Sequence, residues 1–295
     1  MNIKRIIFSK NAAPYFFLLP FILFFAVFRL WPIIWSFCLS FFGYANGEVT
    51  SFTGLGNYIK LFKDATFLQA IWNTLFFVAV YNLIMVFLAL VLAVLVSSPF
   101  IKGRRIYRSI YFIPIAMSLP VVAIVFNMLF AKNIGFISAV YSMFGKTYDF
   151  RVFADMDLAM WMIILMRVWR GVGYYCAYFL AGLTGISEEI YESAKIDGAG
   201  TVKTFLKITL PLLRPVLVFV FIMSSMLSFQ LFDEPWIILQ GGPAGRTTTL
   251  QIYLYQTSFL EGNFAKGSAV SYIMTLLMMG ASVFYVRKLG GKEDN

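Results

Sequence analysis

The sequence contains no histidine, and it has only two cysteines and 14 acidic residues among its 295 residues. Histidine is the most common catalytic base and the most common metal ligand in proteins. The chain therefore lacks both of these groups, and a conventional Ser-His-Asp triad is excluded. The two cysteines, Cys38 and Cys176, are far apart in apolar runs and do not indicate a disulfide framework. We expect both to be buried as small apolar side chains. No catalytic residues and no metal ligands are predicted, and the chain is not expected to be an enzyme.

Charge is scarce as well, whereas apolar residues are abundant. Charged residues make up 13% of the chain, compared with about 25% in soluble domains. Hydrophobic residues make up 60%, aromatic residues 19%, and the mean hydropathy is +0.80. A soluble fold could not bury this much apolar surface, so the composition predicts an all-α membrane protein with several spans. The net charge of +10 does not indicate nucleic-acid binding, because that requires a basic face on a water-soluble domain.

A helix needs about 20 mostly apolar residues to cross a bilayer. We predict one transmembrane domain over residues 1–295 with six spans, at approximately 15–41, 72–97, 109–131, 158–182, 215–239 and 267–286. The start of the chain, Met1–Lys10 and the apolar run after it, is expected to be an uncleaved signal anchor. The run is too long for a secretory signal, and no cleavage site follows it.

The basic residues give the direction of these spans, since cytoplasmic loops carry an excess of Lys and Arg. Three of the 24 basic residues lie inside spans, namely Arg29, Arg167 and Arg170. The larger group of the others lies on one side: Lys4, Arg5, Lys10, Lys102, Arg104, Arg105, Arg108, Lys195, Lys203, Lys207, Arg214, Arg287, Lys288 and Lys292. The smaller group lies on the opposite side: Lys60, Lys63, Lys132, Lys146, Arg151, Arg246 and Lys266. Both termini are therefore predicted to be cytoplasmic.

Residues 185–211, between the fourth and fifth spans, form a segment that is too long for a simple connector and that carries helix start and stop signals. Ser187 is placed to cap a first helix. Gly198 is expected to stop that helix, since glycine accepts the left-handed conformation that often follows a helix C-terminus. Thr201 is expected to cap a second short helix that ends at Pro211. The pattern predicts a helix–turn–helix knob on the cytoplasmic face of the membrane.

The spacing within this segment resembles the cytoplasmic loop of binding-protein-dependent ABC importer permeases. That pattern reads Glu-Ala-Ala, three residues, Gly, nine residues, Ile-x-Leu-Pro, and here Ser193 replaces its middle alanine. The matching residues and their close neighbour Asp197 are Glu192, Ser193, Ala194, Asp197, Gly198, Ile208, Leu210 and Pro211. Other blocks are similar to the carbohydrate branch of this family, which includes maltose and glycerol-phosphate permeases: 54–58, 73–75, 111–114, 232–235 and 241–243.

The resemblance implies a type I ABC importer permease fold in which the loop docks on a separate ATPase subunit. Glu192 matches the acid that pairs with a basic group of the ATPase, and Gly198 matches the turn between the two coupling helices. The implied partners are a second homologous permease, two ATPase subunits and an extracytoplasmic sugar-binding protein, with membrane lipid around the chain and no nucleic acid. Residues 133–157 and 241–266 are candidates for contact with the binding protein.

ATP hydrolysis is assigned to the partner because the chain lacks a phosphate-binding loop. Gly145-Lys146-Thr147 matches the end of such a loop, but Val140 stands at the position of the first glycine. No strand is expected before it, and the predicted topology places it outside the cell. We therefore expect no cofactor bound by this chain, with ATP and Mg used by the partner ATPase.

Polar residues inside the fourth and fifth spans are candidates for the substrate path, since charges inside spans normally face a cavity or a partner. On the fourth span these are Arg167, Gly171, Tyr174 and Tyr178, and on the fifth they are Ser224, Ser228, Gln230 and Asp233. Aromatic rings and hydroxyl partners suit sugars. We also predict that Arg167 or Arg170 pairs with Asp233 or Glu234. The alternative is that these residues only hold the helices together.

The favoured function is the permease subunit of a sugar or oligosaccharide importer. Three alternatives stay open: an ion-coupled secondary transporter, an ABC permease for a non-sugar solute, and an intramembrane enzyme. A secondary transporter would need an internal repeat and buried ion-coordinating acids, and the sequence shows no such repeat. An intramembrane enzyme would need a reactive group of side chains, which the sequence also does not show.

Overall fold

The computed structural model describes residues 13–45, 47–97, 104–132 and 134–289. The predictions for Met1–Lys10, Lys102, Asn133 and Lys292 lie outside these residues. Helices make up most of the described chain, as the composition predicts. Contacts group the chain into two compact units, residues 1–63 with 254–273 and residues 64–253 with 274–295. The single domain over residues 1–295 therefore stays a prediction.

The first unit begins with a long helical segment and a hairpin. It comprises α2 (Ala13–Phe25), a π-helical turn (Ala26–Leu30), α3 (Trp31–Leu39), β1 (Phe42–Ala45), β2 (Glu48–Phe52) and α4 (Gly56–Phe62). The strands pair antiparallel, with Tyr44 opposite Val49. The Asn57 side chain donates hydrogen bonds to the carbonyls of Ser40 at 2.9 Å and Phe42 at 2.7 Å, which fastens the hairpin to α4. This contact gives the block at 54–58 a structural role.

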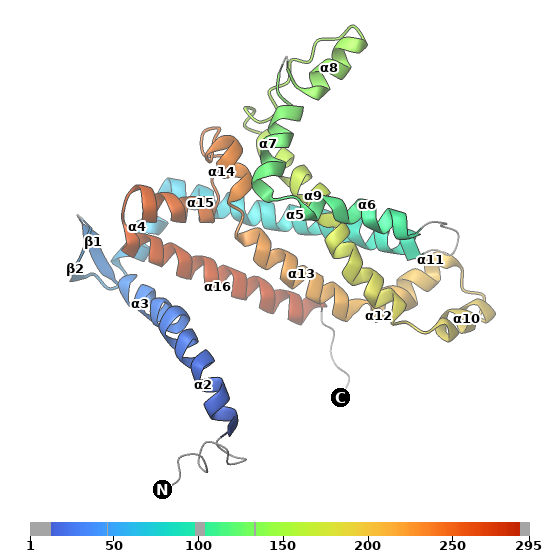
Figure 1. Cartoon of the computed structure of the whole chain (residues 1–295), viewed down its shortest axis with the longest axis horizontal. Helices are drawn as coiled ribbons and strands as arrows, with labels where there is room; N and C mark the ends of the chain where they lie inside the picture. Colours follow the sequence, from blue (N-terminus) through green and yellow to red (C-terminus); the bar gives the residue numbers. More distant parts are fainter. Residues whose placement is uncertain (1–12, 46, 98–103, 133, 290–295) are drawn as a thin grey trace. The chain divides into compact units, whose positions relative to one another are not determined.

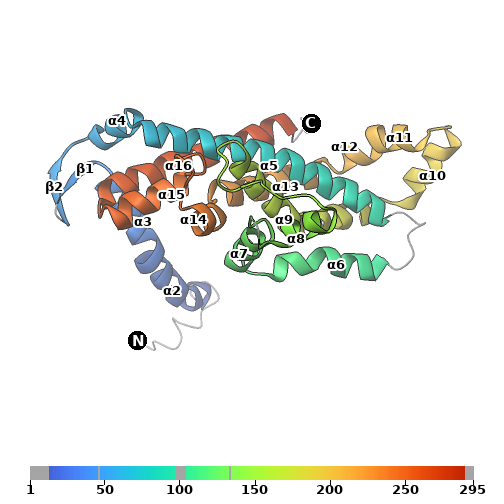
Figure 2. The same cartoon turned by 90° about the horizontal axis from the view of Figure 1, so that it is seen from above.

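The remaining helices are shown in Figure 1 and, from above, in Figure 2. They are α5 (Ala65–Ser97), α6 (Arg104–Ala116), α7 (Leu119–Leu129), α8 (Phe136–Met143), α9 (Leu158–Thr184), α10 (Glu188–Ile196), α11 (Thr201–Thr204), α12 (Leu210–Leu212), α13 (Arg214–Phe229), α14 (Asp233–Leu239), α15 (Leu250–Tyr255) and α16 (Phe264–Leu289), with further π-helical turns at Phe205–Thr209 and Gln256–Leu260. In the second unit α5 packs along α9 and α13, and α6 packs along α9.

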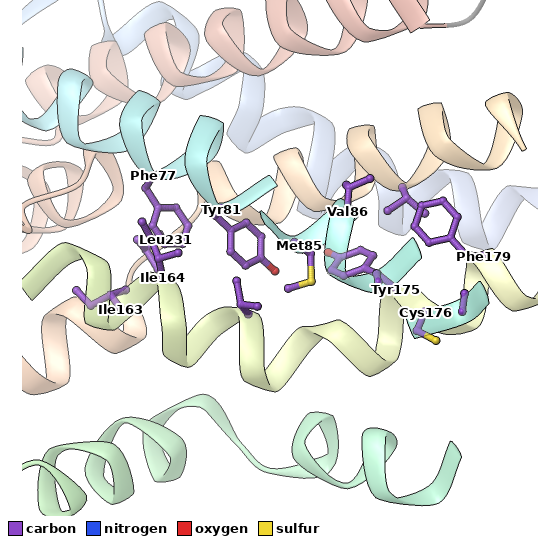
Figure 3. Packing of buried hydrophobic residues seen from close by; sticks show 14 of the residues in the cluster. Phe77, Tyr81, Met85, Val86, Ile163, Ile164, Tyr175, Cys176, Phe179 and Leu231 are labelled. Carbon is purple, nitrogen blue, oxygen red and sulfur yellow. The ribbon is translucent and has the colours of Figure 1, made fainter. Parts of the chain in front are cut away.

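The core of the second unit is one apolar cluster between α5, α9 and α13. Figure 3 shows its centre, where Phe77, Tyr81 and Met85 of α5 face Ile164 and Tyr175 of α9. The rings of Phe77 and Tyr81 are stacked with centroids 5.3 Å apart. Cys176 is buried in this cluster as predicted, whereas Cys38 in the first unit is exposed, so the prediction of burial was wrong for Cys38. Cys38 lies on α3, a helix of a predicted membrane span, where an exposed apolar side chain is compatible with lipid.

Four helical segments in the described part of the chain are long and apolar enough to cross a membrane: Pro14–Leu39, Ala65–Ser97, Arg214–Leu239 and Phe264–Leu289. They correspond to the predicted first, second, fifth and sixth spans. The predicted fourth span coincides with the helix α9, but α9 is not among these four segments. Its two arginines and three glycines reduce its apolar character.

Two predicted spans are interrupted in the structure. The third, 109–131, consists of α6 and α7, which are bent by 101° at a short break around Met117 and Ser118. Counting this pair as one span raises the number of candidate spans to five among the described residues. The fifth, 215–239, is divided into α13 and α14 by a non-helical break at residues 230–232. Each run was predicted as one span, and the breaks within the runs were not predicted.

Candidate functional site: the 185–211 loop and the polar centre of α9

The turn between α10 and α11 has the geometry that the sequence predicts. Gly198 has φ +72°, in the left-handed region. Its backbone N–H donates to the Lys195 carbonyl at 3.0 Å, and the Ala199 N–H donates to the Ala194 carbonyl at 2.9 Å. These two bonds form a Schellman motif, which satisfies the last carbonyls of α10. Gly198 is therefore required by the backbone of this turn.

The ends of the two loop helices differ in part from the prediction. Ser187 precedes α10, as predicted, although its side chain makes no capping hydrogen bond. Gly200, not Thr201, is the residue before α11, and Thr201 is the first residue of that helix. Pro211 does not end the second helix, because helical backbone continues from α11 through α12 towards α13. The π-helical turn at Phe205–Thr209 lies just before this proline, and such a turn already interrupts the regular i→i−4 hydrogen bonds.

The loop exposes some of its motif residues and buries others. Ala194 is buried, and the hydroxyls of Tyr191 and Thr209 are hydrogen-bonded at 3.2 Å between the two arms of the loop. Ile208 and Leu210 are half-buried. The remaining motif residues are exposed: Glu192, Ser193, Asp197, Gly198 and Pro211. Ile196 is 87% exposed and Val202 is 72% exposed, which leaves apolar surface at the tip of the loop.

The two ends of the loop are held closely together. A Cβ atom at Gly182, near the end of α9, would lie 2.8 Å from Leu213 Cδ2 and 2.8 Å from Val216 Cγ2 at the start of α13. Leu213 is fully buried. Gly182 therefore lets the end of α9 approach the start of α13 closely.

The predicted ion pair inside the membrane region is formed by Arg167 and Glu234. Arg167 Nη1 lies 2.6 Å from Glu234 Oε1, and the two side chains are 13% and 0% exposed. Arg167 Nη2 also donates to the Leu227 carbonyl at 3.4 Å. The second oxygen of Glu234, Oε2, has no hydrogen-bond partner within the described residues. Asp233 lies half-buried in the first turn of α14, and no ion pair joins it to an arginine in the described part of the chain.

The other predicted residues of α9 face neighbouring helices. A Cβ atom at Gly171 would lie 2.9 Å from Met85 Cε and 3.2 Å from the Tyr81 hydroxyl, so Gly171 permits the close packing of α9 on α5. The Tyr174 and Tyr178 hydroxyls are hydrogen-bonded at 2.7 Å, and their rings pack edge to face. Both tyrosines are half-buried, so part of each ring remains accessible.

On α13 the serines point inward. Ser224 donates a hydrogen bond to Asn82 Oδ1 of α5, and Ser228 donates to the Ser224 carbonyl at 2.6 Å. Both serines are fully buried. Gln230 is exposed and donates to the Met226 carbonyl at 3.3 Å on its own helix. Ser224 therefore links α13 to α5, whereas the Ser228 hydroxyl bonds within α13, and the substrate path stays a prediction.

Several residues of this region were not predicted as site residues. Asn82 is fully buried and joins α5 to α13, and Glu234 had been only an alternative to Asp233. Gly173 permits the close approach of α6, since a Cβ atom there would collide with the Tyr111 carbonyl oxygen. The Asn73 side chain donates to the carbonyls of Gly245 and Thr248, both at 2.8 Å. Asparagine inside an apolar run was the available signal, since buried polar groups are hydrogen-bonded.

One predicted outer segment, residues 133–157, contains α8 and carries an ion pair between Lys132 and Asp149 at its base. The hydrogen bond and the charge of Lys132 hold the pKa of the Asp149 carboxyl below its usual value. The segment is otherwise largely exposed.

Comparison with known proteins identifies the family. Residues 85–289 match the family described as "Binding-protein-dependent transport system inner membrane component". The arabinooligosaccharides transport system permease protein AraP of Bacillus subtilis is 36% identical over 97% of this chain and 91% of its own length. The lactose transport system permease protein LacF of Rhizobium radiobacter is 34% identical over 89% of both chains.

A solved structure shows the same fold. A chain of the bacterial alginate ABC transporter, crystallised with an alginate pentasaccharide-bound periplasmic protein, has a TM-score of 0.82 at 21% identity, over 94% of each chain. The apolar helices, the 185–211 loop and these similarities agree. The chain belongs to the family of binding-protein-dependent transport system inner membrane components.

Proposed function

We propose that this chain is the permease subunit of an ATP-binding-cassette importer for a sugar or oligosaccharide. It forms half of the translocation path and couples to a separate ATPase through residues 185–211. The observation that carries this proposal is the loop itself: a Schellman turn at Gly198, with Glu192 exposed beside it. An exposed helix–turn–helix of this kind suits docking on a partner protein.

The exposed apolar tip supports docking of a protein. Ile196 and Val202 lie on the outside of the helix–turn–helix, next to the charged side chains of α10. An apolar patch with a polar border is typical of a protein–protein contact. The close contact at Gly182 supports the mechanical role, because force on the loop reaches α9 and α13 together. Closure of two ATPase subunits would then change the tilt of these helices.

The proposed topology has six spans with both termini in the cytoplasm. It treats α6 and α7 as one bent span and α9 as a span whose arginines are satisfied inside the protein. This arrangement places the 185–211 loop on the cytoplasmic side, together with the larger group of basic residues. The partners are a second homologous permease, two ATPase subunits that use ATP and Mg, and an extracytoplasmic sugar-binding protein.

A sugar substrate is supported by the relatives named for arabinooligosaccharides and lactose. The half-buried pair Tyr174 and Tyr178 gives aromatic surface and hydroxyls of the kind that sugars use. One relative, 32% identical, is named for sn-glycerol-3-phosphate, so a phosphorylated polyol is the second candidate. Uptake of labelled oligosaccharides and of glycerol phosphate by the same vesicles distinguishes the two.

The coupling role is tested by reconstituting the full transporter with its ATPase and binding protein. Glu192→Ala should strongly reduce uptake while the amount of permease in the membrane stays normal. Glu189→Ala is the matched control, because Glu189 is an exposed acid on the same helix and lies outside the motif. Equal uptake by both variants would contradict the assignment of Glu192. Uptake by the permease without any ATPase would favour an ion-coupled transporter.

A further inference from the structure

Two arginines of α9 each contact a break between two neighbouring helices. Arg167 and Arg170 lie on adjacent faces of successive turns of α9, within the predicted fourth span. One contacts the break between α13 and α14, and the other contacts the break between α6 and α7. The two breaks are far apart in the sequence, yet one helix contacts both.

Among the residues that the structure describes, Arg170 donates to carbonyl groups and forms no ion pair. Its Nε donates to the Met117 carbonyl at 3.1 Å, and its Nη2 donates to the Ile115 carbonyl at 3.2 Å. The last carbonyls of a helix have no intrahelical donor, and here the chain bends by 101° directly after α6. The guanidinium has several donors in a fixed fork, which suits two adjacent carbonyls. Arg170 therefore stabilises the bend in this orientation.

Arg167 makes the corresponding contact at the second break. It donates to the Leu227 carbonyl in the last turn of α13 and to Glu234 in the first turn of α14. These two acceptors lie on opposite sides of the break at residues 230–232. The guanidinium therefore bridges the break by contacting both α13 and α14 in this conformation.

The short helices that follow the two breaks pack on each other. Val122, Ala123 and Phe126 of α7 form an apolar cluster with Met166 of α9, and Ile238 and Leu239 of α14 pack against this cluster. This cluster is distinct from the larger one between α5, α9 and α13, although Leu239 contacts both. Figure 1 shows α7 and α14 at the same end of α9, next to each other.

We propose that α7 and α14 move as one element about the breaks at residues 117–118 and 230–232. Arg167 and Arg170 are positioning residues that set the orientation of this element on α9. In the proposed transporter the element lies at the outer end of the path, and a tilt of α9 is passed to both short helices at once. The transport role rests on the proposed function, whereas the geometry can be tested without transport.

The test measures two distances by pulsed electron paramagnetic resonance on the assembled transporter in lipid. Spin labels at Val121 and Ile237 lie within the proposed element, and labels at Val121 and Leu165 report its orientation on α9. All three side chains are exposed. The exposed Cys38 is replaced by serine, and the buried Cys176 is retained.

Arg170→Met should broaden the 121–165 distance distribution and leave the 121–237 distribution unchanged. Hydrogen bonds from a charged donor are strong enough that losing two of them raises the population of other orientations by roughly tenfold or more. Arg151→Met, at an exposed arginine of the outer segment, is the matched control and should change neither distribution.

Should Arg170→Met fail to reach the membrane, Arg170→Gln provides a second test, since its amide still donates to one carbonyl. We expect a smaller broadening of the 121–165 distribution with that variant. Unchanged distributions in the variant would show that Arg170 does not set the orientation. Broadening of both distances would show that α7 and α14 do not move as one element. Neither outcome depends on the identity of the substrate.

Discussion

The ion pair between Arg167 and Glu234 allows a quantitative prediction. Glu234 is fully buried and Arg167 is 13% exposed, so neither charge is well solvated. Replacing Glu234 by methionine leaves the guanidinium without its acid, and breaking a buried pair in this way costs about 3–5 kcal/mol. Replacing both residues by methionine removes both charges, and apolar replacement of a whole buried pair is often close to neutral. The double variant should therefore be more stable than Glu234→Met alone.

Stability is measured as the fraction of detergent-extracted protein that stays monodisperse after heating, across a range of temperatures. Arg167→Met and Glu234→Met should each lower the midpoint, and Arg167→Met/Glu234→Met should restore much of the loss. Arg151→Met serves as a control for removal of an exposed arginine. If the two single losses of stability add up in the double variant, the reasoning is refuted. The effects of independent sites are additive, whereas those of a coupled pair are not. In uptake assays, the exchange Arg167→Glu/Glu234→Arg should recover part of the activity that each single reversal loses.

Two glycines give further predictions, with Gly280→Ala as a shared control because nothing lies within 4 Å of its Cβ position on α16. Gly173→Ala should destabilise the protein by about 1–3 kcal/mol, since overpacking forces the backbone to shift and the new Cβ would meet the Tyr111 carbonyl. A heat-stability midpoint equal to that of Gly280→Ala would contradict the close packing of α6 on α9. Gly198→Ala should cost about 1–2 kcal/mol through its left-handed backbone, and it should reduce uptake more than it reduces the protein level. Uptake that falls only in proportion to the protein level would argue against a coupling role for the turn.

The sequence predicted the 185–211 loop well because its signals are local. Gly198 has no Cβ, and a left-handed residue after α10 is what a Schellman turn requires. The end of the second helix, at Pro211, was predicted wrongly. Proline usually ends a helix when it lies in the interior, but Pro211 lies just after the π-helical turn at Phe205–Thr209, where the i→i−4 hydrogen bonds are already interrupted. The local sequence does not distinguish these two positions.

The polar centre of α9 was predicted only in part, because its partners come from other helices. The sequence predicted that Arg167 lies near the fifth span, but it did not distinguish Asp233 from Glu234 as the ion-pair partner. The choice depends on the break at 230–232, which turns Glu234 inward. Arg170 was the alternative to Arg167 for this ion pair, and it instead binds two backbone carbonyls at the bend after α6. Backbone acceptors of this kind carry no sequence signal.

The bends themselves were also missed. Hydropathy measures whether a segment is apolar, and the runs 109–131 and 215–239 are apolar throughout most of their length. Pro114, Pro120 and Pro235 lie within or beside the interrupted regions, and proline favours breaks and kinks. Proline also occurs within the uninterrupted α2, at Pro20, so its presence alone did not identify the breaks.

The central claim is that residues 185–211 dock on an ATPase in the cytoplasm. The most direct measurement places a photo-crosslinking side chain at Ile196, the most exposed apolar residue of the loop, in membranes that contain the whole transporter. The account predicts a crosslink to an ATP-hydrolysing subunit, and Glu192→Ala should weaken it while the amount of permease in the membrane stays normal. A crosslink to an extracytoplasmic protein, or labelling of Ile196→Cys by a membrane-impermeant reagent added outside intact cells, would contradict it.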